Sequence, residues 1–304
     1  MRHLQTLRLI QDVARAGSIR KAAEDLNLTS SALNRRIQAF EAEFGAQIFE
    51  RLPRGVRLNP AGELLMHHIR GQFSDLERVR SQVADLSGAR RGHVSIACSQ
   101  ALNPVFLPGQ IAHYRAEHPA VTFSVRVRDR AAAERELSTF STDLALVFEP
   151  VYLADFEVIK AIPQPVCVLM TADHPLAARQ NLRLHDCLDV PHIVPSEQYG
   201  VRHLLEFATR GRSRRLAPVV EADSFELMRQ YVLYERVVSF QIPIGLPTAD
   251  PRLVIRTLPE RDIRPGLLLL GQMRGRTLPV ASAKFALQLA SALEANEVDG
   301  LAPK

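Results

Sequence analysis

The chain has 304 residues, of which 46% are hydrophobic and 23% charged, and its formal net charge is +5. This length suits two or three globular domains, and the balanced composition excludes a disordered, collagen-like or disulfide-scaffolded chain. The charge excess lies entirely within residues 1–92, whereas residues 93–304 contain 23 basic and 23 acidic residues. The sequence therefore predicts a basic N-terminal part suited to a polyanionic partner, joined to a neutral body.

Cysteine usage and hydropathy bear on the compartment. Cys98, Cys167 and Cys187 are an odd number, and no two of them have the Cys-x-x-Cys spacing of metal or redox sites. No apolar run approaches the roughly 20 residues that a membrane-spanning helix needs, and the N-terminus lacks the apolar core of a signal peptide. We therefore expect a cytoplasmic protein with no membrane partner.

The first predicted element is a helix that begins near Leu4 and ends at Gly17, because apolar residues recur between them every three or four positions. Ser18 is a favourable N-cap for a short second helix that contains Ala22 and Ala23. These two small side chains would let another helix approach closely.

A third helix is predicted to begin after Thr29, which is its natural N-cap. Its inward positions are Leu33, Ile37, Phe40 and Phe44. Its opposite face is polar and basic and consists of Ser30, Ser31, Asn34, Arg35 and Gln38. Two short helices joined by a tight turn, the second presenting donors and acceptors, form the arrangement that enters a DNA major groove. There Arg can bridge O6 and N7 of guanine, and Asn can pair with N6 and N7 of adenine.

Residues 47–58 read as two short strands around a turn that contains proline and glycine, with Arg54 and Arg57 near the tip. A wing of this kind lets arginines reach the DNA backbone or minor groove and adds affinity that does not depend on sequence. The alternative is that these arginines form only a solvated surface.

Five segments of the N-terminal part follow one another in a specific order and spacing. They are residues 17–26, 31–37, 40–45, 48–51 and 55–62. In these segments the chain resembles the LysR-type transcriptional regulators, and the resemblance implies a winged helix-turn-helix DNA-binding domain. Asn34 stands where the family usually has serine, and Asn59 where it usually has threonine.

Asn59 is still a good N-cap for the helix that Pro60 would begin, whereas Asn34 changes the groups that are available to read bases. The candidate DNA-binding residues come from the caps, the polar helix face and the wing. They are Ser18, Thr29, Ser30, Ser31, Asn34, Arg35, Arg36, Gln38, Arg51, Arg54 and Arg57.

A long helix is predicted from Pro60 to about Leu86, because this segment has no further proline and its apolar residues follow a near-heptad spacing. The apolar seam consists of Ile69, Phe73, Leu76, Val79, Val83 and Leu86. The simplest partner of this seam is a second copy, which would place two heads on two DNA half-sites, and the alternative is docking on the chain's own body. The resemblance implies the same homodimer, often extended to a homotetramer.

Two further features belong to this segment. His67 and His68 lack a third ligand and are expected to be solvated. Residues 87–92 look like a hinge.

Past the hinge, strand-like segments alternate with helical ones. Strands are predicted at 93–97, 121–127, 143–148, 166–170, 192–194, 219–220, 237–240 and 267–270. Helices are predicted at 103–117, 131–137, 201–208, 225–233 and 281–293. This alternation indicates an α/β fold with βαβ units and a mainly parallel sheet covered on both faces.

Residues 163–165, Pro-Gln-Pro, break the pattern and divide the body into two sets of elements. Two α/β lobes linked by crossover strands are similar to the periplasmic solute-binding proteins, which the effector domain of the family resembles. We expect a DNA-binding domain at 1–60, a linker helix and hinge at 61–92, and an effector-binding domain at 93–304. Lobe I would comprise about 93–162 and 268–304, and lobe II about 163–267.

Ligands of open α/β folds bind beyond the carboxyl ends of the strands, which predicts a cleft between the lobes. The candidate effector-binding residues are Ser99, Gln100, Arg128, Phe148, Ser196 and Arg202. Arg128 and Arg202 are suited to a carboxylate or phosphate, but each would equally suit a surface or interlobe salt bridge. Cys98 lies beside this cleft, where simple packing is the expected role and redox sensing the alternative.

Signatures of hydrolases, P-loop NTPases, zinc proteases and dinucleotide enzymes are absent from the sequence, so we expect no catalytic residues, no metal and no cofactor. The leading hypothesis is a LysR-type regulator that binds double-stranded promoter DNA, responds to a small-molecule effector and changes contact with RNA polymerase. The alternatives are a repressor that takes no effector and an enzyme with a grafted DNA-binding head.

Overall fold

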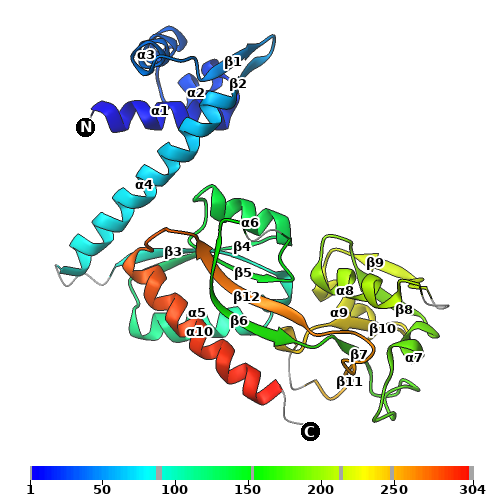
Figure 1. Cartoon of the computed structure of the whole chain (residues 1–304). Helices are drawn as coiled ribbons and strands as arrows, with labels where there is room; N and C mark the ends of the chain where they lie inside the picture. The colour runs from blue at the N-terminus through cyan, green and yellow to red at the C-terminus, as the bar shows by residue number, and fades with distance from the viewer. Residues whose placement is uncertain (1, 87–90, 152–153, 212–214, 247–249, 301–304) are drawn as a thin grey trace. The chain divides into compact units, whose positions relative to one another are not determined.

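The computed structural model describes residues 2–86, 91–151, 154–211, 215–246 and 250–300. The chain folds as two compact units, Met1–Glu77 and Arg78–Lys304, whose elements are drawn in Figure 1. Each unit has its own hydrophobic core.

The first unit begins with the helices α1 (Arg2–Ala16), α2 (Ile19–Asp25) and α3 (Ser30–Phe44). An antiparallel hairpin follows, made of β1 (Phe49–Leu52) and β2 (Gly55–Leu58). Both predicted N-caps are confirmed, because Ser18 Oγ accepts a hydrogen bond from the amide of Lys21 and Thr29 Oγ1 accepts one from the amide of Ala32. The winged helix-turn-helix predicted from the sequence is therefore present.

The core of the first unit joins all of these elements. Its most deeply buried side chains are Leu7, Ile10, Val13, Ala22, Ala23, Leu33, Ile37, Ile48, Met66 and Ile69. The expectation that Phe44 points inward is wrong, because its side chain is 47% exposed. Since α3 ends at this residue and the chain turns at Gly45, Phe44 has only the ring of Phe40 to stack on, at 5.7 Å between centroids.

The long helix α4 (Pro60–Leu86) is confirmed, and at about 1.5 Å per residue it is roughly 40 Å long. Asn59 caps it, with Oδ1 accepting a hydrogen bond from the amide of Gly62 at 2.8 Å. Of the predicted seam, Ile69 is buried in the core of the first unit, while Val79 and Val83 are 45% and 57% exposed. The side chain of Leu86 and residues 87–90 of the predicted hinge lie outside the described residues.

The described part of the second unit contains two five-stranded sheets. The first sheet has the order β4-β3-β5-β12-β6 and the second the order β11-β7-β10-β8-β9. The first is built from β3 (Gly92–Cys98), β4 (Val121–Val127), β5 (Leu144–Phe148), β6 (Phe156–Gln164) and β12 (Gly266–Met273). The second is built from β7 (Cys167–Thr171), β8 (His192–Pro195), β9 (Val220–Ala222), β10 (Val238–Gln241) and β11 (Leu253–Thr257).

The prediction of a mainly parallel sheet is wrong, because both sheets are mixed. In the first sheet β4, β3 and β5 are parallel, whereas β12 runs antiparallel to β5 and to β6. In the second, β10, β8 and β9 are parallel, whereas β7 runs antiparallel to β10 and to β11. The antiparallel strands β7 and β12 are those by which the chain enters each sheet from the other lobe. Such a strand is not preceded by a βαβ crossover in its own sheet, so it need not be parallel to its neighbours.

Strands β6 and β11 and the short helix α7 (Leu184–Leu188) were not predicted from the sequence. The prolines at 163 and 165 hid β6, which extends through Pro163 to Gln164. Pro163 is tolerated because β6 is the edge strand of its sheet, where a missing N–H breaks no internal ladder.

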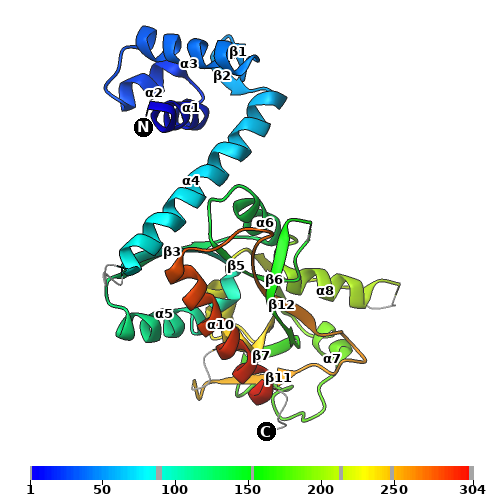
Figure 2. The same cartoon turned by 60° about the vertical axis from the view of Figure 1, so that its left-hand side comes forward.

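Helices cover both faces of the first sheet, as expected for alternating α and β segments (Figures 1 and 2). One face packs α6 (Arg130–Ser138) against Ala145 and Val147, which share a cluster with Leu137. The other face carries α5 (Phe106–Glu117) and α10 (Val280–Gly300). The second sheet is covered by α8 (Gly200–Thr209) and α9 (Phe225–Tyr231).

Candidate nucleic-acid interface and effector site

The outward face of α3 is fixed by the burial of its inward face. Leu33 and Ile37 are 0% and 3% exposed, so they lock the rotation of the helix against α1 and α2. Residues spaced i, i+3, i+4 and i+7 share one side of a helix. That side carries Ser31, Asn34, Arg35 and Gln38, of which Asn34 is half-buried and the others are exposed. We call these four residues the α3 face.

Of the other two candidates on α3, Arg36 lies away from this face, and Ser30 lies at its edge, four residues before Asn34. Arg36 is exposed but is two residues from Asn34, a spacing that places side chains on different sides of a helix. Ser30 is the first residue of α3 and is also exposed. The hydroxyls of Ser18 and Thr29 both act as N-caps, so each accepts a backbone hydrogen bond.

The wing, which is the hairpin of β1 and β2, is hydrogen-bonded to the helical part of the first unit at two places. Glu41 Oε1 accepts hydrogen bonds from the amides of Ile48 and Phe49, at 2.9 and 3.3 Å. At the other end the amide of Val56 donates to the carbonyl of Gly17 at 2.9 Å. Gly55 has φ +144, and a Cβ there would lie 2.2 Å from the carbonyl oxygen of Gly17. A side chain at this position would therefore push the wing away from the first helix.

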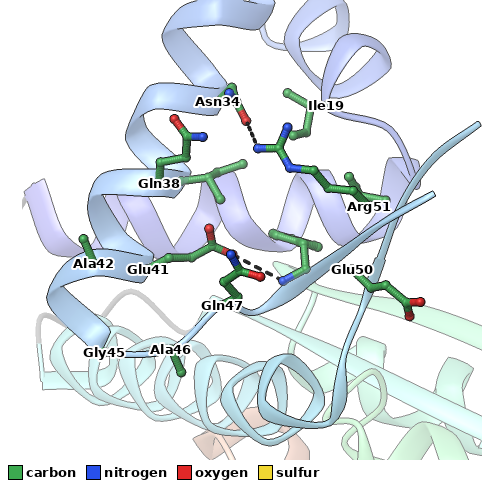
Figure 3. Close-up of a pocket in the computed structure, with 13 residues that line it drawn as sticks. Ile19, Asn34, Gln38, Glu41, Ala42, Gly45, Ala46, Gln47, Glu50 and Arg51 are labelled. Atoms are coloured by element: carbon green, nitrogen blue, oxygen red, sulfur yellow. Dashed lines mark hydrogen bonds between the residues drawn. The ribbon is translucent and has the colours of Figure 1, made fainter. Parts of the chain in front are cut away.

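A groove of about 740 Å³ lies between α3 and the wing. Its lining includes Asn34 and Gln38 from α3 and Arg51 from β1 (Figure 3). Arg51 Nη2 donates a hydrogen bond across the groove to Asn34 Oδ1 at 3.1 Å. Sequence reasoning named both residues but did not foresee the bond, because 17 positions separate them.

The basic side chains of the first unit differ in how far their charge is already neutralised. Arg57 Nε lies 2.7 Å from Glu50 Oε2, which faces it across the hairpin, and this bond raises the pKa of the exposed guanidinium. Within the described residues Arg35, Arg36 and Arg54 have no acidic partner, and all three are exposed. The first unit thus presents unpaired positive charge on α3 and at the tip of the wing.

In the second unit, Gln100 follows β3 and connects the two lobes. Its Nε2 donates to Tyr199 Oη at 2.8 Å and to the carbonyl of Asp223, and its Oε1 accepts from the amide of Phe225 at 3.0 Å. Tyr199 Oη also donates to the carbonyl of Asp223 at 3.0 Å, and burial raises the pKa of this phenol. Tyr199 and Asp223 were missed by the sequence analysis, because neither lies in a recognisable motif. We call these hydrogen bonds of Gln100 the Gln100 bridge.

Phe148 lies at the same seam between the lobes. Its side chain is 3% exposed and packs against two glycines that come from distant parts of the chain. A Cβ on Gly200 would lie 2.8 Å from Phe148 Cδ1, and one on Gly266 would lie 2.2 Å from Phe148 Cζ. Both glycines are therefore required for this close packing, in which the ring lies against Gly200 of α8 and Gly266 of β12.

Ser99 and Ser196 lie near the Gln100 bridge. The amide of Ser99 donates to the carbonyl of Leu146 at 2.9 Å, and the amide of Ser196 donates to the carbonyl of Ala222 at 2.9 Å. Both residues are half-buried. The structure thus brings Ser99, Gln100, Phe148 and Ser196 to one region of the interlobe seam.

Arg128 and Arg202, the two other predicted effector-binding residues, are bound to acidic side chains of the protein itself. Arg128 Nε donates to Glu136 Oε1, and Arg202 donates to Glu206 and Glu221 at 2.7 Å each. The side chain of Arg202 is only 12% exposed. Both arginines therefore take part in salt bridges in this structure, as the alternative interpretation of the sequence described.

Glu149 is a further residue near this seam that was not predicted from the sequence. Glu149 directly follows β5 and binds Arg264 through both carboxylate oxygens, at 2.8 and 3.1 Å. Glu149 Oε1 also accepts from the amide of Leu267 at 2.8 Å. This ion pair fixes the crossover into β12 beside the packed ring of Phe148.

The three cysteines are free and buried. Burial raises the pKa of each thiol to about 12, so Cys98, Cys167 and Cys187 are neutral at neutral pH. Since the thiolate is the reactive form, this environment favours the packing role for Cys98. Among the described residues no group of three His, Cys, Asp or Glu side chains could hold a metal ion, and no helix there is long and apolar enough to cross a membrane.

Two family models match the chain. Residues 4–63 match the model described as bacterial regulatory helix-turn-helix protein, lysR family, and residues 87–294 match the LysR substrate binding domain. Among curated proteins, a RuBisCO operon transcriptional regulator of Allochromatium vinosum is 29% identical over 214 residues, which cover 70% of each chain. A probable nitrogen assimilation transcriptional activator of Synechococcus elongatus is 26% identical over 262 residues, 84% of each chain.

Solved structures show the same fold along nearly the whole chain. A full-length OxyR variant from Pseudomonas aeruginosa superposes with a TM-score of 0.67 at 20% identity, covering 96% of this chain and 94% of the other. Full-length CbnR in complex with its target DNA superposes with a TM-score of 0.64 at 16% identity, covering 95% and 99%.

Proposed function

Because this chain belongs to the LysR family of bacterial transcriptional regulators, we propose that it binds promoter DNA and controls transcription in response to a small molecule. The α3 face carries this proposal: an exposed arginine with no acidic partner among the described residues stands beside Asn34, on a helix whose rotation the core fixes. The relatives compared above are named as transcriptional regulators, and we assign no reaction to the chain.

On the DNA, Asn34 and Arg35 contact base edges, and Ser31 and Gln38 contact bases or neighbouring phosphates. Arg51, Arg54 and Arg57 contact the backbone beside the recognition helix, and Ser18, Thr29, Ser30 and Arg36 contact phosphates on its flanks. Arg57 must exchange Glu50 for phosphate, whereas Arg54 is already free to bind it. Arg54 is therefore expected to contribute more to affinity than Arg57.

The proposed division of labour is DNA binding by 1–60, self-association by 61–92 and effector binding by 93–304, with lobe boundaries near 162 and 267. Exposed Val79 and Val83 on the second half of α4 provide an apolar surface that a second copy would cover. A homodimer, or a pair of dimers, would then hold two reading heads on two half-sites in the cytoplasm, where chromosomal DNA lies.

The effector would enter the interlobe seam near Ser99, Gln100, Phe148 and Ser196. Since the side chain of Gln100 is already hydrogen-bonded in the Gln100 bridge, a ligand that engages it must replace those hydrogen bonds with its own. A ligand that does so binds one lobe arrangement better than the other, and this difference shifts the equilibrium between them. The shift would change the spacing of the two DNA-binding domains of the dimer, and thereby the contact of the regulator with RNA polymerase.

The test of DNA binding is fluorescence anisotropy with the intergenic DNA upstream of the chain's own gene and with a shuffled duplex of the same composition. Specific binding predicts at least about a thousandfold preference for the natural duplex at physiological salt. Equal affinities for the two duplexes would contradict the proposal. Arg115→Ala serves as the control variant, because Arg115 is exposed on α5 and, like Arg35, has no acidic partner among the described residues.

A regulator that takes no effector is the second candidate. It is favoured by the chain's own groups at the seam, since Gln100 and Phe148 occupy it and the cations Arg128 and Arg202 are bound to acids. Titration calorimetry with a panel of carboxylate and phosphate metabolites separates the two candidates. Binding that disappears in both Ser99→Ala and Ser196→Ala variants supports the effector site, and heat-free titrations with unchanged DNA affinity support the second candidate.

A further inference from the structure

The hydrogen bond between Arg51 and Asn34 determines which part of the Asn34 amide is available to DNA. Arg51 Nη2 donates to Asn34 Oδ1 at 3.1 Å, joining β1 to α3 across the groove (Figure 3). A guanidinium group has donors and no acceptor, so the amide must present its oxygen to Arg51. The chemistry of the pair thus fixes the orientation of the amide plane.

This orientation leaves the Nδ2 donors available for base reading, whereas Oδ1 already uses one of its two lone pairs and has the positive guanidinium beside it. Within the described residues the Nδ2 group of Asn34 has no protein partner. An asparagine that pairs with adenine needs both ends of its amide, because it accepts from N6 and donates to N7. Guanine instead offers two acceptors, O6 and N7, on its major-groove edge. We infer that Arg51 makes Asn34 read bases through its donor, because the positive charge beside Oδ1 opposes the approach of the adenine amino group, so that the base recognised by Asn34 is guanine and not adenine.

The inference rests on the proposed function of α3 as the reading helix. The geometry of the wing supports the persistence of the Arg51–Asn34 hydrogen bond when the protein binds DNA. Arg51 pairs with Val56 in the hairpin, and Glu41 ties the start of this hairpin to α3. The backbone of Arg51 is therefore held at a fixed place relative to Asn34. No carboxylate in the described part of the chain competes for Arg51, since neighbouring Glu50 binds Arg57.

Arg51 can meet DNA without releasing Asn34. A guanidinium carries five N–H donors, and the bond to Asn34 occupies one of its two terminal nitrogens. The remaining donors of this exposed side chain are available to a phosphate. Arg51 is thus a positioning residue for base specificity as well as a backbone contact.

The first part of the test selects binding sites from random DNA with the wild-type protein and with Asn34→Ala. The base pair whose preference is lost in the variant is the one that Asn34 contacts. We expect guanine there, preferred about tenfold over adenine, and an equal affinity when inosine, which keeps O6 and N7, replaces it. Adenine at this position, with about a tenfold loss when its 6-amino group is removed, would overturn the inference.

The second part compares Arg51→Met with Arg54→Met, which removes the same charge from the wing without touching Asn34. Both variants should bind all sequences more weakly, but only Arg51→Met should reduce the preference for guanine over adenine from about tenfold to about twofold or less, because the freed amide can rotate. An unchanged preference in Arg51→Met would overturn the inference while leaving DNA binding intact. A wild-type protein with no sequence preference at all would contradict both the inference and the proposed function.

Discussion

Arg35 and Arg54 of the first unit and Arg202 and Arg276 of the second have opposite surroundings. In the first unit Arg35 and Arg54 are exposed and have no acidic partner among the described residues. In the second unit the guanidinium of Arg202 is bound by Glu206 and Glu221, and the side chain of Arg276, only 6% exposed, is bound by Asp143. The two arginines of the first unit are thus available for an external anion, and the two of the second are neutralised internally.

This difference accords with the net charge of +5 in residues 1–92, where basic residues outnumber acidic ones, so that some guanidinium groups have no carboxylate to bind. An unpaired guanidinium on the surface needs to release only counterions when a phosphate arrives, which makes it an effective contact for DNA. A guanidinium that already holds a carboxylate must first break that bond. The comparison therefore predicts that variants of the unpaired arginines of the first unit affect DNA binding, and that variants of the ion-paired, buried arginines of the second affect folding.

The largest expected effect is on stability, in Arg276→Met. Arg276 Nη2 binds Asp143 Oδ1 at 2.6 Å and Nη1 binds the carbonyl of Thr142 at 2.9 Å, so the substitution leaves a buried carboxylate unpaired. Asp143 loses its cation but keeps the hydrogen bonds that Oδ2 accepts from the amide of Ser95 and from Ser282 Oγ. We expect the free energy of unfolding to fall by about 3 kcal/mol, measured by urea denaturation. Arg115→Met, on the exposed surface of α5, is the control and should change it by less than about 0.5 kcal/mol. Equal effects of the two substitutions would break the comparison.

Arg35→Ala should lower the affinity for the preferred operator by about 1–3 kcal/mol, because a bidentate arginine–guanine contact is lost. The free energy of unfolding should stay within about 0.5 kcal/mol of wild type, since the side chain is exposed and makes no ion pair within the described residues. Anisotropy titrations against a set of single-base operator variants would measure the loss. A variant that weakened every sequence equally would show that Arg35 contacts only the backbone.

Gln100→Ala removes the hydrogen bonds that join the two lobes and leaves the amide of Phe225 and the carbonyl of Asp223 without this partner. A loss of about 1–3 kcal/mol in unfolding free energy is expected, together with faster hydrogen exchange at residues 223–225. Gln180→Ala is the matched control, because Gln180 is exposed. If exchange at these amides were the same in both variants, the Gln100 bridge would not be what holds the lobes together.

The smallest expected effect is that of Arg54→Ala. Removal of one phosphate contact should weaken specific and non-specific DNA alike by about 1 kcal/mol, and should reduce the slope of log affinity against log salt by about 1. The corresponding measurement for Arg57→Ala should give a smaller change, because Glu50 already neutralises Arg57. A larger effect at Arg57 than at Arg54 would contradict the argument from pre-existing ion pairs.

The first unit could be predicted closely because its signals are local. The spacing of Leu33 and Ile37 gave the buried side of α3, and Thr29 gave its start. Phe44 follows the same spacing but is exposed, because burial also requires a neighbour at the end of the helix. Periodicity predicts which side of a helix faces the core, and it does not predict where the core ends.

The second unit was predicted less well because its decisive contacts join distant residues. The prolines on either side of Gln164 concealed β6, and the direction of β12 depends on the path between the lobes. The pair of Arg202 and Glu206 has the i, i+4 spacing of a helical salt bridge and was visible in the sequence. The Gln100 bridge was not, since Gln100 lies 99 to 125 positions from its partners.

The central claim is that the α3 face reads DNA sequence, and selection of binding sites from random duplexes tests it most directly. The full-length wild-type protein and the double variant Asn34→Ala/Arg35→Ala would be selected side by side, with Arg115→Ala as a control. Our account predicts one motif with two related half-sites for the wild type and the control, and loss of preference at one or two base pairs of each half-site in the double variant. The same motif from the double variant as from the wild type would contradict the claim.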